Sequence, residues 1–337
     1  MLDYDNYDAV FNKGDSGDDY NLRRSKLTLY HYFDENWQGK IQLSYNDKKN
    51  KFEEKDINLT YNGWKFADIR LGKFKQPYGL EYSTSSKNLL AIERSMATNA
   101  FSLGRSYGIG LSSHHKKSTW AVGLFDATNE EDVFSDYAIT GRFTHLAYQS
   151  EQQLIHIGMS GSWRKAQEKK HQINVNMEVY NAKKVVESPK LPVKYIGQYG
   201  VEAIWQYQSF LLQSEIFKQH VSVKSNFPTQ DAQYNGYYIQ ASYLLTGEKH
   251  RYKKGRFVSL KPENNYGAWE IVARYSDLNA HDNNDGRQAK NTMLGLNYYA
   301  NKKIRLMFNY IHGQLSDDEL FATDSGEAFS ARIQYVF

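Results

Sequence analysis

Basic side chains recur at every second position in several segments of this sequence, where they share a face with other polar residues. An arginine guanidinium keeps its charge at any physiological pH and can hold an oxyanion with two parallel hydrogen bonds. A lysine ammonium attracts the same anions as a compact point charge. A row of such groups on a wetted wall, each binding weakly, would accept small anions and release them again. The residues with this placement are Arg24, Lys26, Lys40, Arg70, Arg142, Arg274, Arg305 and Arg332.

A second group of cations lies in or next to the long connection 76–104. Lys87, Arg94 and Arg105 would narrow an anion path if this loop folded inward. A simpler role is also open for the loop, because an ion pair from Glu81 or Glu93 to a wall arginine would only fix the loop in place.

Each wall charge also has a simpler role, because a wetted wall needs polar groups whatever passes along it. Some cations would then pair with acids on the same faces, as Arg274 could with Glu270. The acids with this placement are Asp56, Glu202, Glu215 and Glu270. Since the basic residues outnumber them, we expect anions to pass more easily than cations.

The elements that position these side chains are indicated by a hydrophobic period of two. In residues 56–61, for example, Ile57, Leu59 and Tyr61 alternate with polar residues, which is typical of a strand with one apolar face. Similar runs occur at 26–30, 40–45, 69–71, 107–111, 139–143, 155–159, 201–205, 237–245, 269–275, 294–298, 304–310 and 329–337.

The connections between these runs are alternately short and long, which predicts short turns at one end of the sheet and long loops at the other. The long connections are 12–20, 47–52, 76–104, 127–135, 165–197, 221–233, 278–289 and 314–326. With the short side they would join sixteen strands, if 173–179 belongs to a long loop or extends a neighbouring strand. An odd count would contradict this interpretation. The connection 247–265 is long although it occupies a short-turn position.

Composition excludes several classes of protein. The 337 residues contain no cysteine, which excludes a disulfide scaffold, a thiolate zinc site and a cysteine nucleophile. No apolar run approaches the ~18 residues of a membrane-spanning helix. The net charge of +4 comes from interleaved acids and bases, which argues against a nucleic-acid partner. Because the first residues show no apolar export segment, we expect any signal peptide to be absent from this sequence.

Two architectures fit many alternating strands: a soluble sandwich or propeller with inward apolar faces, and a transmembrane barrel with outward ones. The predicted strands run for about 10 residues, whereas globular strands average nearer 5–6. Aromatic residues make up 15% of the chain, with 27 Tyr, and they gather at the ends of apolar faces, as membrane interfaces favour. We therefore expect an all-β protein, a sixteen-stranded antiparallel transmembrane β-barrel formed by a single domain, residues 1–337.

Several segments also resemble the phosphate-selective porin O/P family of Gram-negative outer membranes. The central one is 69–81, Ile-Arg-Leu-Gly-Lys-Phe-Lys-Gln-Pro-Tyr-Gly-Leu-Glu, followed by 84–87 and Glu93-Arg94. Arg23-Arg24, the segments 236–248 and 261–270, and the terminal 332–337 agree with it in order along the chain.

The resemblance implies a trimeric sixteen-stranded barrel surrounded by outer-membrane lipid and lipopolysaccharide. It also implies that the third long loop, 76–104, folds into the lumen as a constriction. Some family members pass phosphate or polyphosphate along basic side chains. Phosphate-specific members carry clustered arginines in the region of 165–197, and residues 171–178 of this chain contain none, which argues against strict selectivity for phosphate.

The remaining motifs indicate no metal, cofactor or catalytic site. His114-His115 lacks a third ligand at a suitable spacing. The stretch 282–286 fails as a calcium loop, because His281 stands where the first aspartate is required. The acidic loop with Asp15, Asp18 and Asp19 is expected to be solvated, with surface calcium as an alternative.

We therefore predict an outer-membrane porin for passive diffusion of small hydrophilic solutes, favouring anions such as phosphate or polyphosphate, and not an enzyme. The alternative is a general pore, weakly cation-selective if the acidic loops Asp15–Asp19, Glu130–Asp132 and Asp317–Glu319 dominate its mouth. A barrel enzyme would need Ser, His and an acid converging at one place. A structural barrel with a plugged lumen would not conduct.

Overall fold

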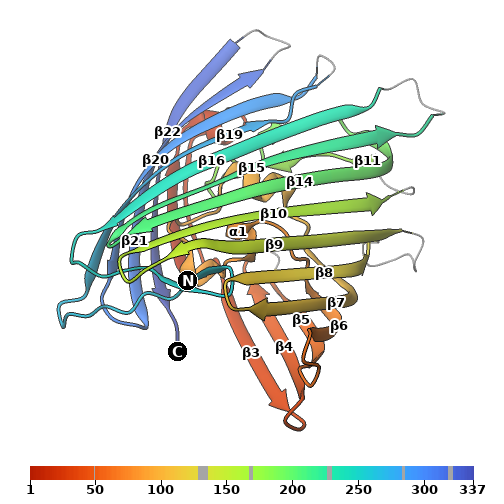
Figure 1. Ribbon diagram of the computed structural model, residues 1–337. Coiled ribbons are helices and arrows are strands. Elements are labelled where there is room, and N and C mark those ends of the chain that lie inside the picture. Colours follow the sequence, from red (N-terminus) through yellow and green to blue (C-terminus); the bar gives the residue numbers. More distant parts are fainter. Residues whose placement is uncertain (49, 128–135, 167–169, 226–229, 283–284, 318–321) are drawn as a thin grey trace.

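The computed structural model describes residues 1–48, 50–127, 136–166, 170–225, 230–282, 285–317 and 322–337. These residues form twenty-two strands and four short helices, and eighteen of the strands belong to one antiparallel sheet (Figure 1). Within these ranges, no helix has the length and apolar character needed to cross a membrane. The predicted acidic residues Glu130–Asp132 lie outside the described residues, as do Asp318 and Glu319 and part of the stretch 282–286.

Seventeen strands make up most of the sheet, and they are joined in chain order by turns or loops. They are β1 (Leu2–Tyr7), β2 (Gly17–Asn21) with β3 (Ser25–Tyr32), β4 (Trp37–Asn46), β5 (Lys51–Tyr61), β6 (Asp68–Lys75), β7 (Arg105–His115), β8 (Ser118–Asp126), β9 (Tyr137–Gln149), β10 (Gln153–Lys165), β14 (Leu191–Tyr207), β15 (Phe210–Val223), β16 (Ala232–Leu244), β19 (Ala268–Asn279), β20 (Arg287–Tyr299), β21 (Ile304–Asp317) and β22 (Ala322–Tyr335).

Short elements occupy the long connections. They are η1 (Ala9–Phe11), α1 (Leu80–Ser83), η2 (Ser86–Asn88), α2 (Met96–Phe101), β11 (Lys170–His171), β12 (Asn174–Val175), β13 (Val186–Glu187), β17 (Arg251–Lys253) and β18 (Arg256–Val258). β12 pairs with β13 and β17 pairs with β18, in two small hairpins outside the main sheet. The predicted placement of 173–179 within a long loop agrees with this arrangement.

The strand ladder runs without interruption from β3 to β22 and continues through β1 to β2. β2 and β3 are consecutive in the chain and are separated only by residues 22–24. The two ends of the ladder therefore belong to neighbouring parts of the chain. The main sheet contains eighteen strands when β2, β3 and β11 are each counted separately. Sixteen transmembrane strands therefore stay a prediction. Closure of the sheet by hydrogen bonds between β2 and β3 also stays a prediction.

The two faces of the sheet have the polarity that the barrel interpretation predicts, and not that of a sandwich. On β19, Trp269 and Ile271 are 38% and 46% exposed, whereas Glu270 between them is 0% exposed. On β16, Tyr237 and Ile239 are exposed while Tyr238 is buried. The apolar residues thus lie on the convex face, and the polar residues lie on the concave face.

The concave face encloses the segment 76–104, which contains α1, η2 and α2. Side chains from β14, β15, β19, β21 and β22 contact this one segment, so the sheet must curve around it. Apolar residues of the segment are fully buried and pack on the wall, where the rings of Phe101 and Tyr78 stack against Phe217. The loop therefore folds inward, as the family resemblance implies.

Candidate functional site

Three buried arginines of the wall hold the segment 76–104, which we call the constriction loop. Arg274 on β19 donates to Glu81 Oε1 at 3.2 Å and to the carbonyl oxygen of Glu93 at 2.9 Å. Arg305 on β21 donates to the carbonyl oxygen of Leu89 at 2.7 Å. Together with Arg332 on β22, these side chains are at most 3% exposed. Each of them hydrogen-bonds the loop and is also paired with an acid outside it, namely Glu178, Glu270 and Asp3 respectively.

Glu93 is the most heavily paired carboxylate of the constriction loop. Arg23 holds it with two hydrogen bonds, at 3.0 and 2.9 Å, and Arg24 and Arg332 approach it at 3.2 and 2.9 Å. Burial by itself raises the pKa of Glu93, but the three guanidinium groups outweigh burial and hold the pKa well below its ordinary value. The sequence-based suggestion that Glu81 or Glu93 fixes the loop through a wall arginine is therefore confirmed for both residues.

The first turn of the loop is held by a carboxylate of the opposite wall. The backbone N–H groups of Leu80 and Glu81 donate to the two oxygens of Glu215, at 2.5 and 2.8 Å. Gly79 precedes them with φ of +61°, and a Cβ there would lie 2.9 Å from Glu215 Oε1. Glycine is required at this position because only it tolerates both the conformation and the close approach.

A second inserted segment, 172–188, packs against the constriction loop. The carboxylate of Glu178 accepts hydrogen bonds from the backbone of Met96 at 3.0 Å and from Ser276 Oγ at 2.5 Å. Burial raises the pKa of Glu178 above its ordinary value, although Arg274 lies 3.5 Å away. Arg23 stacks on Tyr180, with 3.5 Å between the guanidinium carbon and the ring centroid. This segment therefore supports the loop and brings no arginine of its own to the concave side.

A third inserted segment is the hairpin β17–β18, which comes from the end of the sheet that carries the short turns. Tyr252 OH lies 2.6 Å from His156 Nδ1, and Arg142 donates to the carbonyl oxygen of Gly255 at 2.9 Å. Arg256 reaches the constriction loop at the carbonyl oxygen of Ser83, 3.4 Å away. The hairpin thus explains why the connection 247–265 is long, and it brings further basic residues to the concave side.

Solvent reaches the concave side mainly along the first strands. The concave residues Lys26 on β3 and Lys40 on β4 are half-buried, as are their neighbours Thr28 and Gln42. The concave residues of β14, β15, β16 and β19 are buried beneath the inserted segments. The less covered part of the concave side therefore lies between the constriction loop and the wall of the first strands, and we call it the path.

Four cations meet where this path passes the constriction loop: Lys26, Lys75, Arg94 and Arg105, which we call the basic cluster. Lys75 lies within electrostatic range of the other three. Lys26 Nζ lies 3.5 Å from Ser86 Oγ, and Lys75 Nζ donates to the carbonyl oxygen of Tyr82 at 2.5 Å. Arg94 donates to the carbonyl oxygens of Glu81 and Thr84, at 3.0 and 2.9 Å. Because neutral oxygens fill most of these contacts, the cations keep an excess of positive charge.

Asp56 on β5 is a carboxylate at the border of the basic cluster. It accepts hydrogen bonds from Arg105 Nε at 2.7 Å and from Lys40 Nζ at 2.5 Å. One acid is thus shared between two cations, which reduces the local positive charge without cancelling it. An anion arriving at the cluster would compete with Asp56 for Arg105.

The cations predicted from the sequence fall into two sets. Those in buried or nearly buried ion pairs are Arg24, Arg142, Arg274, Arg305 and Arg332. Those that are half-buried or exposed are Lys26, Lys40, Arg70, Lys87, Arg94 and Arg105. A role in an anion path stays a prediction for both sets, and the contacts favour the second.

One suggested pairing is not found in the described part of the chain, namely Arg274 with Glu270. The two residues are four positions apart on β19, which is about 13 Å along a strand. Glu270 instead meets His250 at 2.8 Å and Arg305 at 3.7 Å. Sequence reasoning also missed Lys75, although it stands inside the motif 69–81.

No group of three or more potential metal ligands is found among the described residues. His114 Nδ1 lies 2.9 Å from Thr119 Oγ1. Asp15 is an exposed partner of Lys183, at 3.0 Å.

Comparison with known proteins places this arrangement among outer-membrane channels. The chain is 26% identical to Porin O of Pseudomonas aeruginosa, over an alignment that covers all of this chain and 86% of that protein. The fold is similar to OmpT of Vibrio cholerae, with a TM-score of 0.65 and 11% identity, covering 100% of this chain and 94% of that one. It is also similar to the anion-selective porin of Comamonas acidovorans, with a TM-score of 0.62 and 12% identity, covering 100% and 99% of the two chains.

The family profile gives the most direct assignment. The profile described as "Phosphate-selective porin O and P" matches residues 1–337, so the match includes the constriction loop and every strand of the sheet. Porin O of Pseudomonas aeruginosa agrees with this assignment, as does the fold shared with OmpT, which is described as an outer membrane protein. The chain therefore belongs to the phosphate-selective porin O and P family, and it is a non-enzymatic porin of the outer membrane.

Proposed function

We propose that the protein is a passive pore that favours small anions, with the basic cluster as its selective constriction. The observation that carries this proposal is the contact pattern of Lys26, Lys75, Arg94 and Arg105. These four cations are half-buried beside this path, and their hydrogen-bond partners are mostly neutral oxygens. A charged ring at a narrow point sets which ions enter.

The proposed architecture is a single domain, residues 1–337, forming a sixteen-stranded transmembrane barrel. The number follows if β2 and β3 form one interrupted strand and β11 extends the wall beside β14. Closure would then occur around residues 22–24, where the two ends of the ladder are consecutive. Support comes from the exposed apolar band of the convex face, which suits contact with lipid.

The chemistry favours oxyanions such as phosphate or polyphosphate as solutes. Arg94 and Arg105 can each present a planar donor pair, and Lys26 and Lys75 add point charges beside them. Asp56 competes for Arg105 and would shorten the residence of a bound anion, which a conducting pore requires. Several weak sites in series conduct better than one tight site.

The test is the reversal potential of the purified protein in a planar bilayer under a KCl gradient. We expect the sign that indicates chloride permeating faster than potassium, and we expect added phosphate to reduce the chloride current. A reversal potential of the opposite sign would refute the proposal. Anion selectivity without competition by phosphate would instead indicate a general anion pore, which the lack of arginine in 171–178 favours as the second candidate.

We also propose a homotrimer. One solved form of OmpT of Vibrio cholerae is described as a trimer, and the chain shares that fold with a TM-score of 0.62. Native mass spectrometry of the protein in a mild detergent tests this directly. A monomer as the sole species would contradict it.

A further inference from the structure

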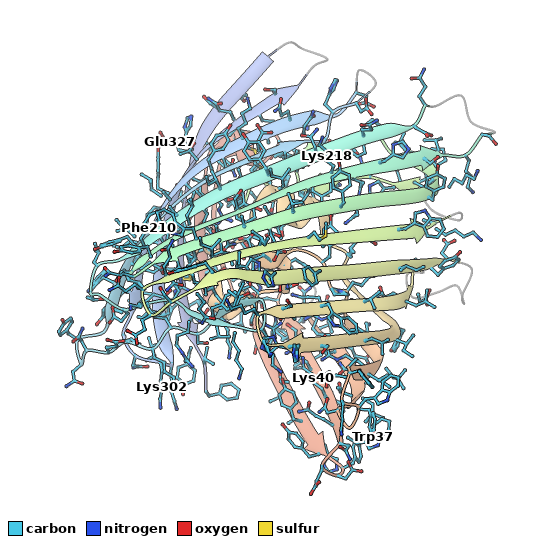
Figure 2. The ribbon with its side chains drawn as sticks, in the orientation of Figure 1. Trp37, Lys40, Phe210, Lys218, Lys302 and Glu327 are labelled. Carbon is cyan, nitrogen blue, oxygen red and sulfur yellow. The ribbon has the colours of Figure 1, made fainter. Side chains whose placement is uncertain are left out.

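Lys218 on β15 occupies a position of the convex face that an apolar residue would be expected to fill. Its neighbour on the same face, Ile216, is 49% exposed, and Lys218 is exposed as well (Figure 2). Its cross-strand neighbours are Tyr199 and Asn235, which carry no charge. No hydrogen bond or ion pair of its ammonium group is found within the residues that the structure describes. A lysine that faces lipid without a partner needs an anion or water within reach.

A groove of about 720 Å³ lies beside Lys218 on this outer face. Ile139, Trp163 and Tyr199 form apolar walls, and all three are exposed. Lys218 and His220 line the groove from β15. The groove thus combines apolar walls, suited to a hydrocarbon chain, with the ammonium group of Lys218 at one side. His220 lies beside it and is paired with Asp231 at 3.4 Å.

The floor of the groove is bare because three glycines of adjacent strands lie there: Gly141 on β9, Gly161 on β10 and Gly197 on β14. Gly141 and Gly161 face each other directly in the ladder, and Gly197 faces Trp163. An added Cβ at Gly197 would meet no atom within 4 Å, and at Gly161 only a carbonyl oxygen at 3.9 Å. Packing of the protein itself therefore does not require glycine at these two positions.

The groove lies toward the ends of the strands that carry the long connections. Lys218 precedes the end of β15, Val223, by five residues. Next to it, the ring of Trp163 lies 5.6 Å from that of Tyr137 and 6.3 Å from that of Tyr195, which forms an aromatic group of the kind found at membrane interfaces. In outer-membrane barrels the long loops face the outside of the cell. The groove then lies at the level of the headgroups of the outer leaflet.

We propose that this groove binds a phosphorylated lipid of the outer leaflet. One acyl chain lies over the glycine floor between Trp163 and Tyr199, and a headgroup phosphate pairs with Lys218, with His220 next to it. Charge complementarity identifies the occupant, because an unpaired ammonium beside an apolar channel matches a phosphate joined to a hydrocarbon chain. The proposal rests on the membrane location of the protein and is independent of the ion selectivity of its pore.

The experiment titrates the purified full-length protein in detergent with bisphosphorylated lipid A, using native mass spectrometry to count bound lipid. We expect Lys218→Gln to weaken the apparent affinity about tenfold, the size of one charge-assisted hydrogen bond. Lys290→Gln is the matched control, because Lys290 is exposed on β20 and its cross-strand neighbour is the acid Asp277. The control should bind lipid A within about twofold of the unmodified protein.

A second variant tests the groove itself. An added Cβ at Gly197 meets no atom within 4 Å, so Gly197→Leu should place a side chain over the floor. It should also weaken lipid A binding, while β content measured by circular dichroism stays unchanged. Two further probes distinguish the contribution of the phosphate from that of the acyl chain. Dephosphorylated lipid A should bind more weakly, and inorganic phosphate alone should not displace lipid A. Equal affinity of the unmodified protein and both variants for lipid A, or equal affinity for the dephosphorylated lipid, would overturn the proposal. Lys218 would then be a lysine whose ammonium group is hydrated at the membrane interface.

Discussion

The carboxylate of Glu93 and the guanidinium of Arg332 form an ion pair of 2.9 Å that joins the constriction loop to the last strand of the sheet. Arg332 also donates to Asp3 at the start of the chain and to the carbonyl oxygen of Ile92. A single buried guanidinium thus connects β1, β22 and the loop. The position of the loop, and therefore the width of the path beside it, depends on this contact.

Replacing Glu93 by Gln should loosen the constriction loop. The change leaves Arg23, Arg24 and Arg332 close together without their shared carboxylate, and breaking a buried pair in this way typically costs about 3–5 kcal/mol. We expect a lower unfolding midpoint in detergent and noisier single-channel currents. Glu53→Gln is a suitable control, because Glu53 pairs with Lys55 in a partly exposed bridge of 2.7 Å. Equal thermal stability of the two variants would contradict this role for Glu93.

The ion pairs of Glu93 with the three arginines should persist at mildly acidic pH. Because the arginines hold the folded-state pKa of Glu93 well below its ordinary value, its contribution to stability is present above the ordinary pKa of about 4.5 and is lost only as the pH falls through the lower, folded-state pKa. Single-channel noise that comes from the loop should therefore stay constant from pH 7 to below pH 4.5 and increase at more acidic pH. An increase in noise already between pH 6 and pH 5 would show that another group controls the loop.

Glu178→Gln should be tolerated much better than Glu93→Gln. Burial raises the pKa of Glu178, so at pH 7 this carboxyl group destabilises the folded protein relative to the unfolded chain, where it ionises freely, and a neutral amide removes that cost. The amide oxygen can still accept the hydrogen bonds from Met96 and Ser276. We expect an unfolding midpoint at pH 7 equal to or above that of the unmodified protein. A loss as large as that of Glu93→Gln would mean that the ion pair with Arg274 dominates.

The strands, and which residues of each strand lie on its apolar face, could be predicted from the sequence because alternation is a local property. Each apolar run of two-residue period needs only its own residues to define its faces, and Ile271 and Glu270 lie on the predicted sides. The inward fold of the constriction loop was implied by family resemblance alone, since nothing in the alternation places residues 76–104. Neither the alternation nor the family resemblance indicated which individual cations would be buried in ion pairs. Arg70 and Arg305 both belong to alternating runs in the sequence, yet the first is half-buried and the second is buried against the carbonyl oxygen of Leu89.

The partners of inserted segments were beyond sequence reasoning because they join residues far apart in the chain. The bond between Arg142 and Gly255 spans 113 positions, and that between Arg23 and Glu93 spans 70. The unusual length of the connection 247–265 was the one available signal for the hairpin β17–β18. It indicated an insertion, and it did not indicate that the hairpin would reach the constriction loop at Ser83.

Asp56→Asn should increase the preference for anions. The change frees Arg105 and Lys40 from their shared carboxylate and removes one negative charge at the edge of the basic cluster. We expect the anion-to-cation permeability ratio, measured as a reversal potential in a KCl gradient, to rise by about twofold or more. Glu53→Gln again serves as the control, with little effect. A ratio that falls on loss of Asp56 would show that this residue orders the cations instead of weakening them.

Charge reversal at Arg94 and at Lys87 should have different effects on ion selectivity. The sequence predicts both loop cations to lie on an anion path. Arg94 is half-buried in the basic cluster, so Arg94→Glu should reduce the anion-to-cation permeability ratio several-fold, about what one reversed charge at a narrow point produces. Lys87 is exposed beside Lys302 and Lys303, which would compensate for its loss, and Lys87→Glu should change the ratio by less than about twofold.

Because Arg94 also bonds the carbonyl oxygens of Glu81 and Thr84, Lys26→Gln is the companion variant that removes a charge from the cluster while leaving those two bonds in place. If Lys26→Gln and Arg94→Glu both leave the reversal potential unchanged, the selective constriction lies away from the basic cluster, and the exposed lysines of the β17–β18 hairpin are the next residues to replace.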